Sequence, residues 1–482
     1  MSATPSFKPS IKLLDATMMV AGSMIGSGIF IVSADITRHT GSAGWLLLVW
    51  LITGFMTLTA ALSYGELSGM FPRAGGQYIY LKEAYNPMTA FLYGWSFFTV
   101  IQTATIAAVG VAFAKFTAYL LPVFSEENVV LPLGSLQITA AQLLSILVIV
   151  FLTYMNTRGI EGGKTIQTTF TLTKLISLGA LIVCGLVALK PAVWQANWQD
   201  AWHLHALTDT GTAASYTTMA AFGAIAAAMV GSVFSSDSWH NVAFVAGEIK
   251  NPKRNIGLSL FLGTAIVTVV YLLTNITYLS VLPLSEIAHA PKDRVAVSVS
   301  QAVLGNAGTI VIAVMIMVST FGCNNGLILA GARVYHTMAN DGLFFKRAGT
   351  LNKAAVPSFA LWIQCLLACL WCLSGRYGDL LDMISFVVVA FYMLTIAGIF
   401  ILRKKRPHAE RPYKAFGYPV LPILYIIMGL AFCGLLFIYK PRFTWPGLII
   451  TLSGIPVYYL ANKRKNGEAA AVSARETADA QP

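Results

Sequence analysis

Two short polar interruptions stand out in a chain made mostly of long apolar runs. They are Gly26-Ser27-Gly28 and Ser235-Ser236-Asp237-Ser238, and each falls inside a run long enough to cross a membrane as a helix. A helix that unwinds in lipid frees backbone N–H and C=O groups, which is tolerated only where they line a cavity. A freed helix N-terminus attracts a carboxylate, and a freed C-terminus attracts an ammonium group. Together the two breaks predict a binding site for a zwitterion such as an α-amino acid.

Two charged residues also lie within apolar runs. Asp237 belongs to the second break, and a carboxylate at mid-membrane marks a functional site by default. We interpret it as a group that either recognises a cationic side chain or takes up a proton. The alternatives are a structural partner for Lys174 or a protonated, silent acid. Lys174 lies too deep in its run to reach the interface easily, which predicts a buried, fixed or proton-exchanging charge; a tilted span that brings it near the surface is the alternative.

The composition places these residues in a membrane protein. The 482 residues are 56% hydrophobic and 11% charged, with a mean hydropathy of +0.69. So few charges cannot cover the surface of a soluble protein of this length. Apolar runs of about 20 residues predict twelve membrane-spanning helices. They cover residues 14–37, 44–70, 88–121, 139–156, 164–189, 215–247, 256–282, 297–338, 356–374, 379–402, 415–439 and 443–461.

The lysines and arginines predict the orientation of these spans. With an even number of spans both termini lie on one side. Placing them in the cytoplasm gives the cytoplasmic segments 22 Lys and Arg against seven on the other side. This asymmetry follows the positive-inside rule and predicts a multi-pass protein of the inner (cytoplasmic) membrane. The net charge of +12 is therefore an orientation signal with a weak attraction to membrane lipid, not a nucleic-acid footprint.

The termini and cysteines predict no further chemistry. Residues 1–13 predict a short cytoplasmic tail without a removable signal peptide, and residues 462–482 predict a disordered cytoplasmic tail. All six cysteines fall in apolar runs, which predicts neither a disulfide framework nor a metal site. We expect no organic cofactor.

The two breaks lie five spans apart. An odd number of spans per repeat turns the second copy upside down, and paired broken helices in inverted repeats are typical of secondary transporters. The sequence therefore predicts a first repeat at 14–189, an inverted second repeat at 215–402, and two further spans at 415–461. The expected fold class is an all-α membrane protein with a 5+5 inverted repeat and two extra helices.

Several motifs occur in the same order as in a known family. They are Gly26-Ser27-Gly28-Ile29-Phe30, Phe71-Pro72-Arg73-Ala74-Gly75-Gly76, Glu248-Ile249-Lys250-Asn251-Pro252, Tyr271-Leu272-Leu273-Thr274-Asn275 and Phe321-Gly322-Cys323-Asn324-Asn325-Gly326. On these residues nearly the whole chain resembles the amino acid–polyamine–organocation (APC) superfamily, and within it the L-type amino acid transporter branch. The resemblance implies the LeuT-type fold and transport by alternating access.

The resemblance also implies roles for single residues. The substrate carboxylate would rest on the amides of Ser27 and Gly28, under an aromatic gate, Phe234. Lys174 would take the place where sodium-driven relatives hold a cation, with Tyr271 near it. The amine would rest on carbonyls of Met24, Phe234 and Asp237. The full candidate set for substrate binding is Met24, Gly26, Ser27, Gly28, Phe234, Ser235, Asp237 and Trp239, and that for coupling or gating is Lys174, Tyr271, Asn325 and Phe234.

Three departures from the family pattern qualify these roles. Family members have Tyr-Gly or Ala-Gly before this tryptophan, whereas this chain has Ser236-Asp237-Ser238 before Trp239. His240 stands where an asparagine is common. An acid at this position accompanies acceptance of cationic amino acids among relatives. The loop 122–138 lacks the cysteine that joins animal members to a glycoprotein heavy chain. We therefore expect a bacterial-type protein without a disulfide-linked heavy chain.

Other functional classes fit less well. An enzyme would need a nucleophile–base pair or metal cluster, and a nucleotide-driven pump would need a phosphate-binding loop; the sequence shows neither. The resulting hypothesis is a secondary transporter of neutral L-amino acids, with cationic ones as a further possibility, that works by sodium-independent exchange or facilitated uptake. Proton-coupled symport is the alternative mechanism. A membrane amino-acid sensor is the alternative of another class.

Overall fold

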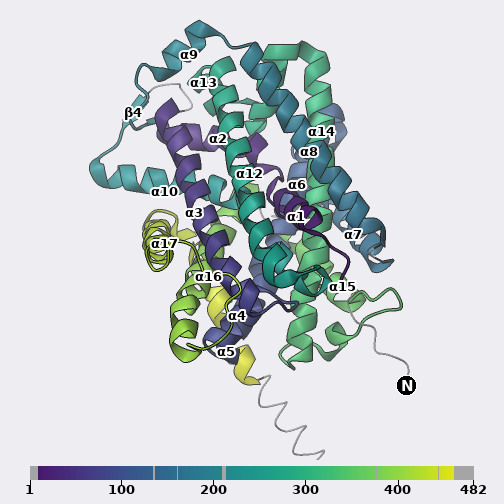
Figure 1. Cartoon of the computed structure of the whole chain (residues 1–482). Helices are drawn as coiled ribbons and strands as arrows, with labels where there is room; N and C mark the ends of the chain where they lie inside the picture. The colour runs from purple at the N-terminus through teal and green to yellow at the C-terminus, as the bar shows by residue number, and fades with distance from the viewer. Residues whose placement is uncertain are drawn as a thin grey trace, which may run out of the picture.

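The chain folds into a bundle of helices, as its apolar composition requires (Figure 1). A computed structural model describes residues 9–133, 136–159, 161–208, 213–374, 377–442 and 444–460. The predicted tails 1–13 and 462–482 lie largely outside the described residues. The α-helices are α1 (Leu13–Met24), α2 (Gly28–Thr40), α3 (Ala43–Met70), α4 (Gln77–Ala84), α5 (Pro87–Ser96), α6 (Gln102–Leu120), α7 (Ala140–Thr157), α8 (Glu161–Val187), α9 (Pro191–Trp198), α10 (Thr218–Ser235), α11 (Asn241–Phe244), α12 (Pro252–Val281), α13 (Leu284–Ala288), α14 (Val295–Asn340), α15 (Ser358–Ser374), α16 (Tyr377–Lys405) and α17 (Val420–Tyr439).

Shorter elements join these helices. A π-helical turn, η1 (Phe97–Ile101), connects α5 to α6, and residues 444–460 are helical after α17. Single 3-10 turns are η2 (Pro122–Phe124), η3 (Ala246–Glu248), η4 (Pro291–Asp293) and η5 (Lys346–Gly349). Two antiparallel hairpins pair β1 (Val129–Leu133) with β2 (Leu136–Thr139), and β3 (His205–Leu207) with β4 (Ala213–Ser215). The sequence does not predict these hairpins, because each strand is too short for a periodic pattern.

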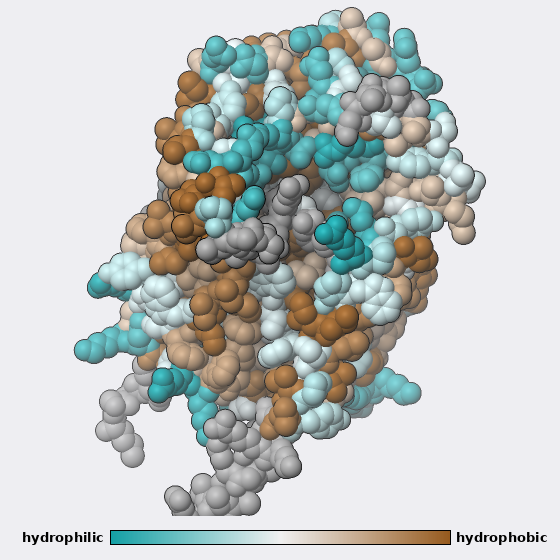
Figure 2. Space-filling view, turned by 180° about the vertical axis from the view of Figure 1, so that it is seen from behind, coloured by the Kyte–Doolittle hydropathy of each residue, from teal (hydrophilic) through white to brown (hydrophobic). Residues whose placement is uncertain are grey.

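The long helices have the length and composition of membrane spans. Among the described residues nine helices qualify, and the bent pair α1 and α2 makes a tenth; Ser358–Leu373 is a shorter apolar helix. Figure 2 shows hydrophilic residues gathered at the upper end of the molecule and hydrophobic residues over much of the surface below. The chain is thus an all-α multi-pass membrane protein, since only helices satisfy their own backbone in lipid. The count of twelve spans and the inverted repeat stay predictions.

Two predicted spans differ from the observed helices. The span predicted at 215–247 ends as a helix at Ser235, and only the four-residue helix α11 follows its break. The span predicted at 297–338 is longer, and Gly305 interrupts it with a φ of +65° that favours glycine. The polar residues 235–238 predict the break itself, but hydropathy detects neither the short helix after it nor the kink at Gly305, because the residues around both remain largely apolar.

Close helix packing brings the two broken spans together. α10 packs on α2, α1 packs on α12 and α8, and α3 packs on α12. Small residues allow these approaches: a Cβ on Gly263 of α12 would lie 2.4 Å from a Val20 methyl on α1, and one on Gly54 of α3 would lie 2.3 Å from Thr268. The broken ends therefore meet within the bundle.

Candidate substrate site

The first break separates α1 from α2 by a bend of 43°. Ile25 leaves helical geometry, with a ψ of 87°, and the Gly26 N–H donates to the Met24 carbonyl at 2.8 Å instead of to the preceding turn. A helix leaves its first N–H groups without intrahelical acceptors. Those of α2 begin at Ser27 and Gly28, which places the start of this helix at the break.

Lys174 of α8 binds the carbonyl groups freed at the end of α1. Its ammonium nitrogen donates to the Gly22 carbonyl at 2.8 Å and to the Ile25 carbonyl at 2.9 Å. The residue is 1% exposed, so its charge is held inside the bundle and not at the membrane surface. A buried charge is tolerated only where hydrogen bonds compensate its lost solvation. The ammonium and the broken helix end therefore stabilise each other.

A tyrosine hydroxyl links this break to the second one. The Tyr271 hydroxyl lies 3.0 Å from the Met24 carbonyl and 3.0 Å from the Ser235 carbonyl, at the ends of α1 and α10. Gly28 also lies directly against the second broken span, since a Cβ there would come within 1.9 Å of Ser235 Oγ. The two broken ends are thus in contact.

The second break runs from Ser236 to His240. The Asp237 N–H turns back to the Phe234 carbonyl at 3.2 Å, and Ser238 adopts a left-handed φ of 65°. A non-glycine residue rarely occupies this region of backbone space, and such positions cluster at functional sites. The structure therefore departs from helix for longer here than at the first break.

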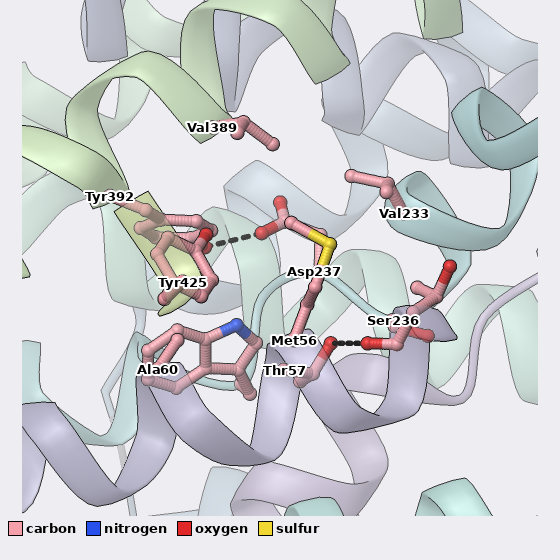
Figure 3. A pocket seen from close by; sticks show the side chains of 11 residues that line it. Met56, Thr57, Ala60, Val233, Ser236, Asp237, Val389, Tyr392 and Tyr425 are labelled. Carbon is pink, nitrogen blue, oxygen red and sulfur yellow. Dashed lines mark hydrogen bonds between the residues drawn. The ribbon is translucent and has the colours of Figure 1, made fainter. Parts of the chain in front are cut away.

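The Asp237 carboxylate lies in a hydrogen-bonded group of three buried side chains. Tyr392 of α16 points its hydroxyl at Asp237, as Figure 3 shows, and the same hydroxyl lies 2.7 Å from Nδ1 of His240. A tyrosine hydroxyl carries only one proton. If it donates to an ionised Asp237, then His240 must donate from Nδ1; if Asp237 is protonated and donates, His240 can accept. The charge of the acid is thereby tied to the tautomer of the histidine.

Asp237 faces a small cavity in this conformation. The cavity holds about 20 Å³, which is room for roughly one water molecule. Figure 3 shows the carboxylate directed into it from the second break. Its lining residues are Thr53, Met56, Thr57, Ala60, Val233, Ser236, Asp237, Trp239, Val389, Tyr392 and Tyr425. A substrate side chain can reach the carboxylate only if these walls move apart.

A larger hollow opens at the end of the molecule that carries the C-terminus of α2. Its volume is about 420 Å³, and Ile31 and Gly231 are among the residues that line it. Ile31 lies about one helical turn after Gly28, and Gly231 lies about one turn before Ser235. Ion pairs stand at its rim, with Arg38 at 2.6 Å from Asp293 and Lys440 at 3.3 Å from Asp382. The hollow thus leads from a charged mouth toward the two breaks.

Known proteins are similar to this chain over most of its length. The pattern of the amino acid permease family matches residues 11–461. The chain belongs to this family. It is 29% identical to the mouse Asc-type amino acid transporter 1 over 94% of this chain and 81% of that protein. It is 30% identical to the serine/threonine exchanger SteT of Bacillus subtilis over 95% of this chain and 98% of that one, and 29% identical to the human cystine/glutamate transporter over 94% and 85%.

Family membership identifies the chain as a membrane amino acid transporter and not an enzyme. The APC resemblance drawn from the motifs is therefore confirmed, including the L-type branch. The roles of single residues are not tested by it and stay predictions.

At the end opposite the hollow, ion pairs join segments that are distant in the sequence. Arg333 of α14 lies 3.2 Å from Glu248 of η3, and the backbone of Ser10 and Ile11 bonds to Glu248 and Lys250 at 2.8–2.9 Å. Glu66 of α3 is held by Arg403 at 2.7 Å and Arg411 at 3.3 Å. Glu66 and Arg333 are thus both buried partners in ion pairs.

The structure gathers most of the predicted residues of the permease at the breaks. Met24, Gly26, Ser27, Gly28, Lys174 and Tyr271 surround the first break, and Phe234, Ser235, Asp237 and Trp239 belong to the second. Asn325 differs, because its side chain accepts from Asn156 Nδ2 at 2.7 Å and joins α14 to α7. Its neighbour Asn324 is 1% exposed, and its amide has no hydrogen-bond partner among the described residues.

The sequence did not predict Tyr392 or Tyr425 as residues of this site, although both line the cavity at Asp237. Tyr392 reaches Asp237 from 155 positions along the chain, within an apolar helix that carries no break or motif of its own. No local signal distinguishes it from the other aromatic residues of the spans. His240 was noticeable only as a departure from the family pattern.

Proposed function

We propose that this permease carries L-amino acids across the cytoplasmic membrane by alternating access, without sodium, by exchange or facilitated uptake. The observation that supports it is the contact between the two broken spans. The start of α2 has N–H donors, and the ends of α1 and α10 have carbonyl acceptors. The carboxylate would bind the amides of Ser27 and Gly28. The amine would bind carbonyls of Met24, Phe234 and Asp237. The Met24 carbonyl can accept a hydrogen bond from the amine in addition to the one from the Tyr271 hydroxyl, because a carbonyl oxygen has two lone pairs.

Lys174 supports independence from sodium. Its ammonium takes up the carbonyls of Gly22 and Ile25, which are the oxygen ligands that a hard cation at this break would use. A covalently attached charge removes the need for a co-transported one. The name of one relative, a serine/threonine exchanger, favours exchange among the mechanisms without sodium.

The hollow and the ion pairs support alternating access. One end of the site opens into about 420 Å³, while ion pairs close the other. Transport would reverse this pattern, breaking the contacts of Glu248 while the pairs at Arg38 and Asp382 close in. With the orientation predicted from Lys and Arg, the open end is extracellular and both termini are cytoplasmic. We propose that the permease works without a disulfide-linked heavy chain.

Asp237 would set the choice of side chain. As an anion it would attract a cationic side chain and hold it among the aromatic residues around the cavity. Held as an acid, it would leave a neutral surface suited to neutral side chains. The hydrogen bonds to Tyr392 and through it to His240 give the carboxylate a route to exchange a proton. For this reason proton-coupled symport is the second candidate mechanism.

The test is counterflow in proteoliposomes. Purified full-length permease is reconstituted into vesicles preloaded with unlabelled leucine, serine, lysine or no amino acid. Uptake of labelled leucine is then measured with pH and sodium varied independently. We expect uptake to require internal amino acid and to be unchanged when choline replaces sodium.

Three outcomes would contradict the proposal in different ways. Accumulation only under a sodium gradient would remove the role of Lys174. Uptake that follows an imposed pH gradient without internal amino acid would favour symport. Binding without any counterflow would favour a sensor. In parallel, Asp237→Asn should lower the rate for lysine relative to leucine or flatten the pH dependence; if both are unchanged, Asp237 has neither proposed role.

A further inference from the structure

A third cavity, larger than these two, lies on the outside of the bundle, away from the substrate site. It is a groove of about 830 Å³ between α3, the start of α12 and the segment 412–421. This volume lies in the upper part of the roughly 300–1,000 Å³ range of small-molecule pockets. Its walls are apolar: Phe55, Leu58, Leu62, Leu258, Phe261, Phe416 and Leu421. Phe55, Phe261 and Phe416 are 39%, 38% and 69% exposed, so the groove opens to the surface that faces the membrane.

Positive side chains stand at one end of this groove. Lys253, Arg254 and Lys414 line it, and all three are exposed. Lys253 pairs with Glu410 at 2.8 Å, while Arg254 and Lys414 form no ion pair within the described part of the chain. Burial raises the pKa of the neighbouring Tyr413 phenol, so it adds no negative charge. The groove thus combines an apolar length with a net positive end.

The groove is held in shape from behind. Glu66 of α3 accepts the Ala415 N–H at 2.7 Å and binds Arg403 and Arg411, which fixes the segment around Ala415 against α3. A Cβ on Gly65 would lie 2.8 Å from the Tyr413 ring and 3.5 Å from Gly257 of α12. The three walls therefore meet at small residues and a buried ion pair, and do not depend on surface side chains.

We propose that this groove binds one anionic phospholipid, with an acyl chain along the aromatic walls and its phosphate at Arg254 and Lys414. A free phosphate would use the positive end but none of the apolar length. A zwitterionic lipid would gain less from the two cations, because its headgroup has no net charge. The groove lies at the end that carries the basic segments, and the leaflet on that side is the one rich in anionic lipid under the predicted orientation. The inference depends on membrane insertion and not on the proposed transport cycle.

Native mass spectrometry of the purified full-length protein tests this directly. The protein in detergent is mixed with equal amounts of phosphatidylglycerol and phosphatidylcholine of the same acyl chains, and separately with inorganic phosphate. We expect preferential retention of one phosphatidylglycerol. The double variant Arg254→Gln, Lys414→Gln should lower its retention by about fivefold for each cation removed. The matched control Arg347→Gln, Lys353→Gln, which removes two exposed charges from another loop, should leave it unchanged.

A variant of the apolar wall separates lipid from a simple charge effect. Leu258→Trp narrows the groove and keeps both cations, and we expect it to lower retention of phosphatidylglycerol as well. Equal retention of the two lipids would overturn the proposal. So would phosphatidylglycerol retention that survives the double variant, phosphate binding as strong as lipid binding, or a second copy of the chain occupying the groove. A folded state of each variant is confirmed by its elution as a single species in the same detergent.

Discussion

The two breaks of the permease differ in the groups that surround them. At the first break, side chains from neighbouring helices bind four successive carbonyls: Lys174 binds those of Gly22 and Ile25, Tyr271 binds that of Met24, and Cys323 lies 3.4 Å from that of Ser23. At the second break, the broken segment itself supplies the Asp237 carboxylate. This carboxylate accepts a hydrogen bond from the hydroxyl of Tyr392 of α16, beside a cavity that has room for about one water molecule.

This difference indicates a division of labour. The donors at the first break come from neighbouring helices, so this break suits the carboxylate and, through the Met24 carbonyl, part of the amine that all α-amino acids share. The second break exposes a titratable group to a space that must enlarge, so it suits the variable side chain. We therefore expect changes at the first break to affect all substrates equally and changes at the second to alter preference among them.

The largest effect should come from Lys174→Met. The change keeps the apolar stem but leaves the Gly22 carbonyl without its donor and the Ile25 carbonyl with only Ser319 Oγ, at 3.4 Å. A buried polar group left unpaired costs about 1–3 kcal/mol. The middle of this range, about 2 kcal/mol, amounts to roughly thirtyfold in the population of the binding-competent state. Counterflow should fall to this extent for leucine and lysine alike, while Lys353→Met at an exposed position should have no effect. Unequal loss between the two substrates would break the division proposed above.

Gly28→Ala should have the next largest effect. The added methyl would lie 1.9 Å from Ser235 Oγ and must push the two breaks apart. Overpacking of this kind costs about 1–3 kcal/mol, which is on the order of a tenfold loss of counterflow for every substrate. Gly434→Ala is the matched control, because nothing lies within 4 Å of the added atom. The double variant Gly28→Ala, Ser235→Gly removes the clashing side chain and should recover much of the activity; failure to recover would mean that Gly28 matters for another reason.

The sequence predicted the parts of the site that rest on local chemistry. Long apolar runs indicate spans, and Gly26 or Ser236 within such a run indicates a break, because these residues do not favour a continuous apolar helix. The fold class and the position of both breaks follow from these features alone. The role of Lys174 came from the family resemblance, and the structure adds its two acceptors.

The remaining part could not be predicted because it depends on contacts between distant segments. Tyr392 meets Asp237 only because α16 packs beside α10, and nothing in the apolar sequence around Tyr392 marks it. In the same way Glu66 indicates an ion pair, but not that its partners would be Arg403 and Arg411. Packing chooses these partners, and the periodicity of a span carries no information about them.

The smallest effect, and the sharpest for the comparison, should come from Tyr392→Phe. The ring keeps its packing against Trp239, whose centroid lies 5.2 Å away, while the hydroxyl between Asp237 and His240 is lost. One hydrogen bond contributes about 1 kcal/mol, so the ratio of lysine to leucine counterflow should change by roughly fivefold. The total rate for leucine should change less than this ratio. The pH dependence should also change, since the link between the acid and the histidine tautomer is cut. Adding Asp237→Asn to Tyr392→Phe should produce no further change in the pH dependence. If Tyr392→Phe instead slows both substrates equally, the second break is part of the common site, and side-chain choice must be made elsewhere.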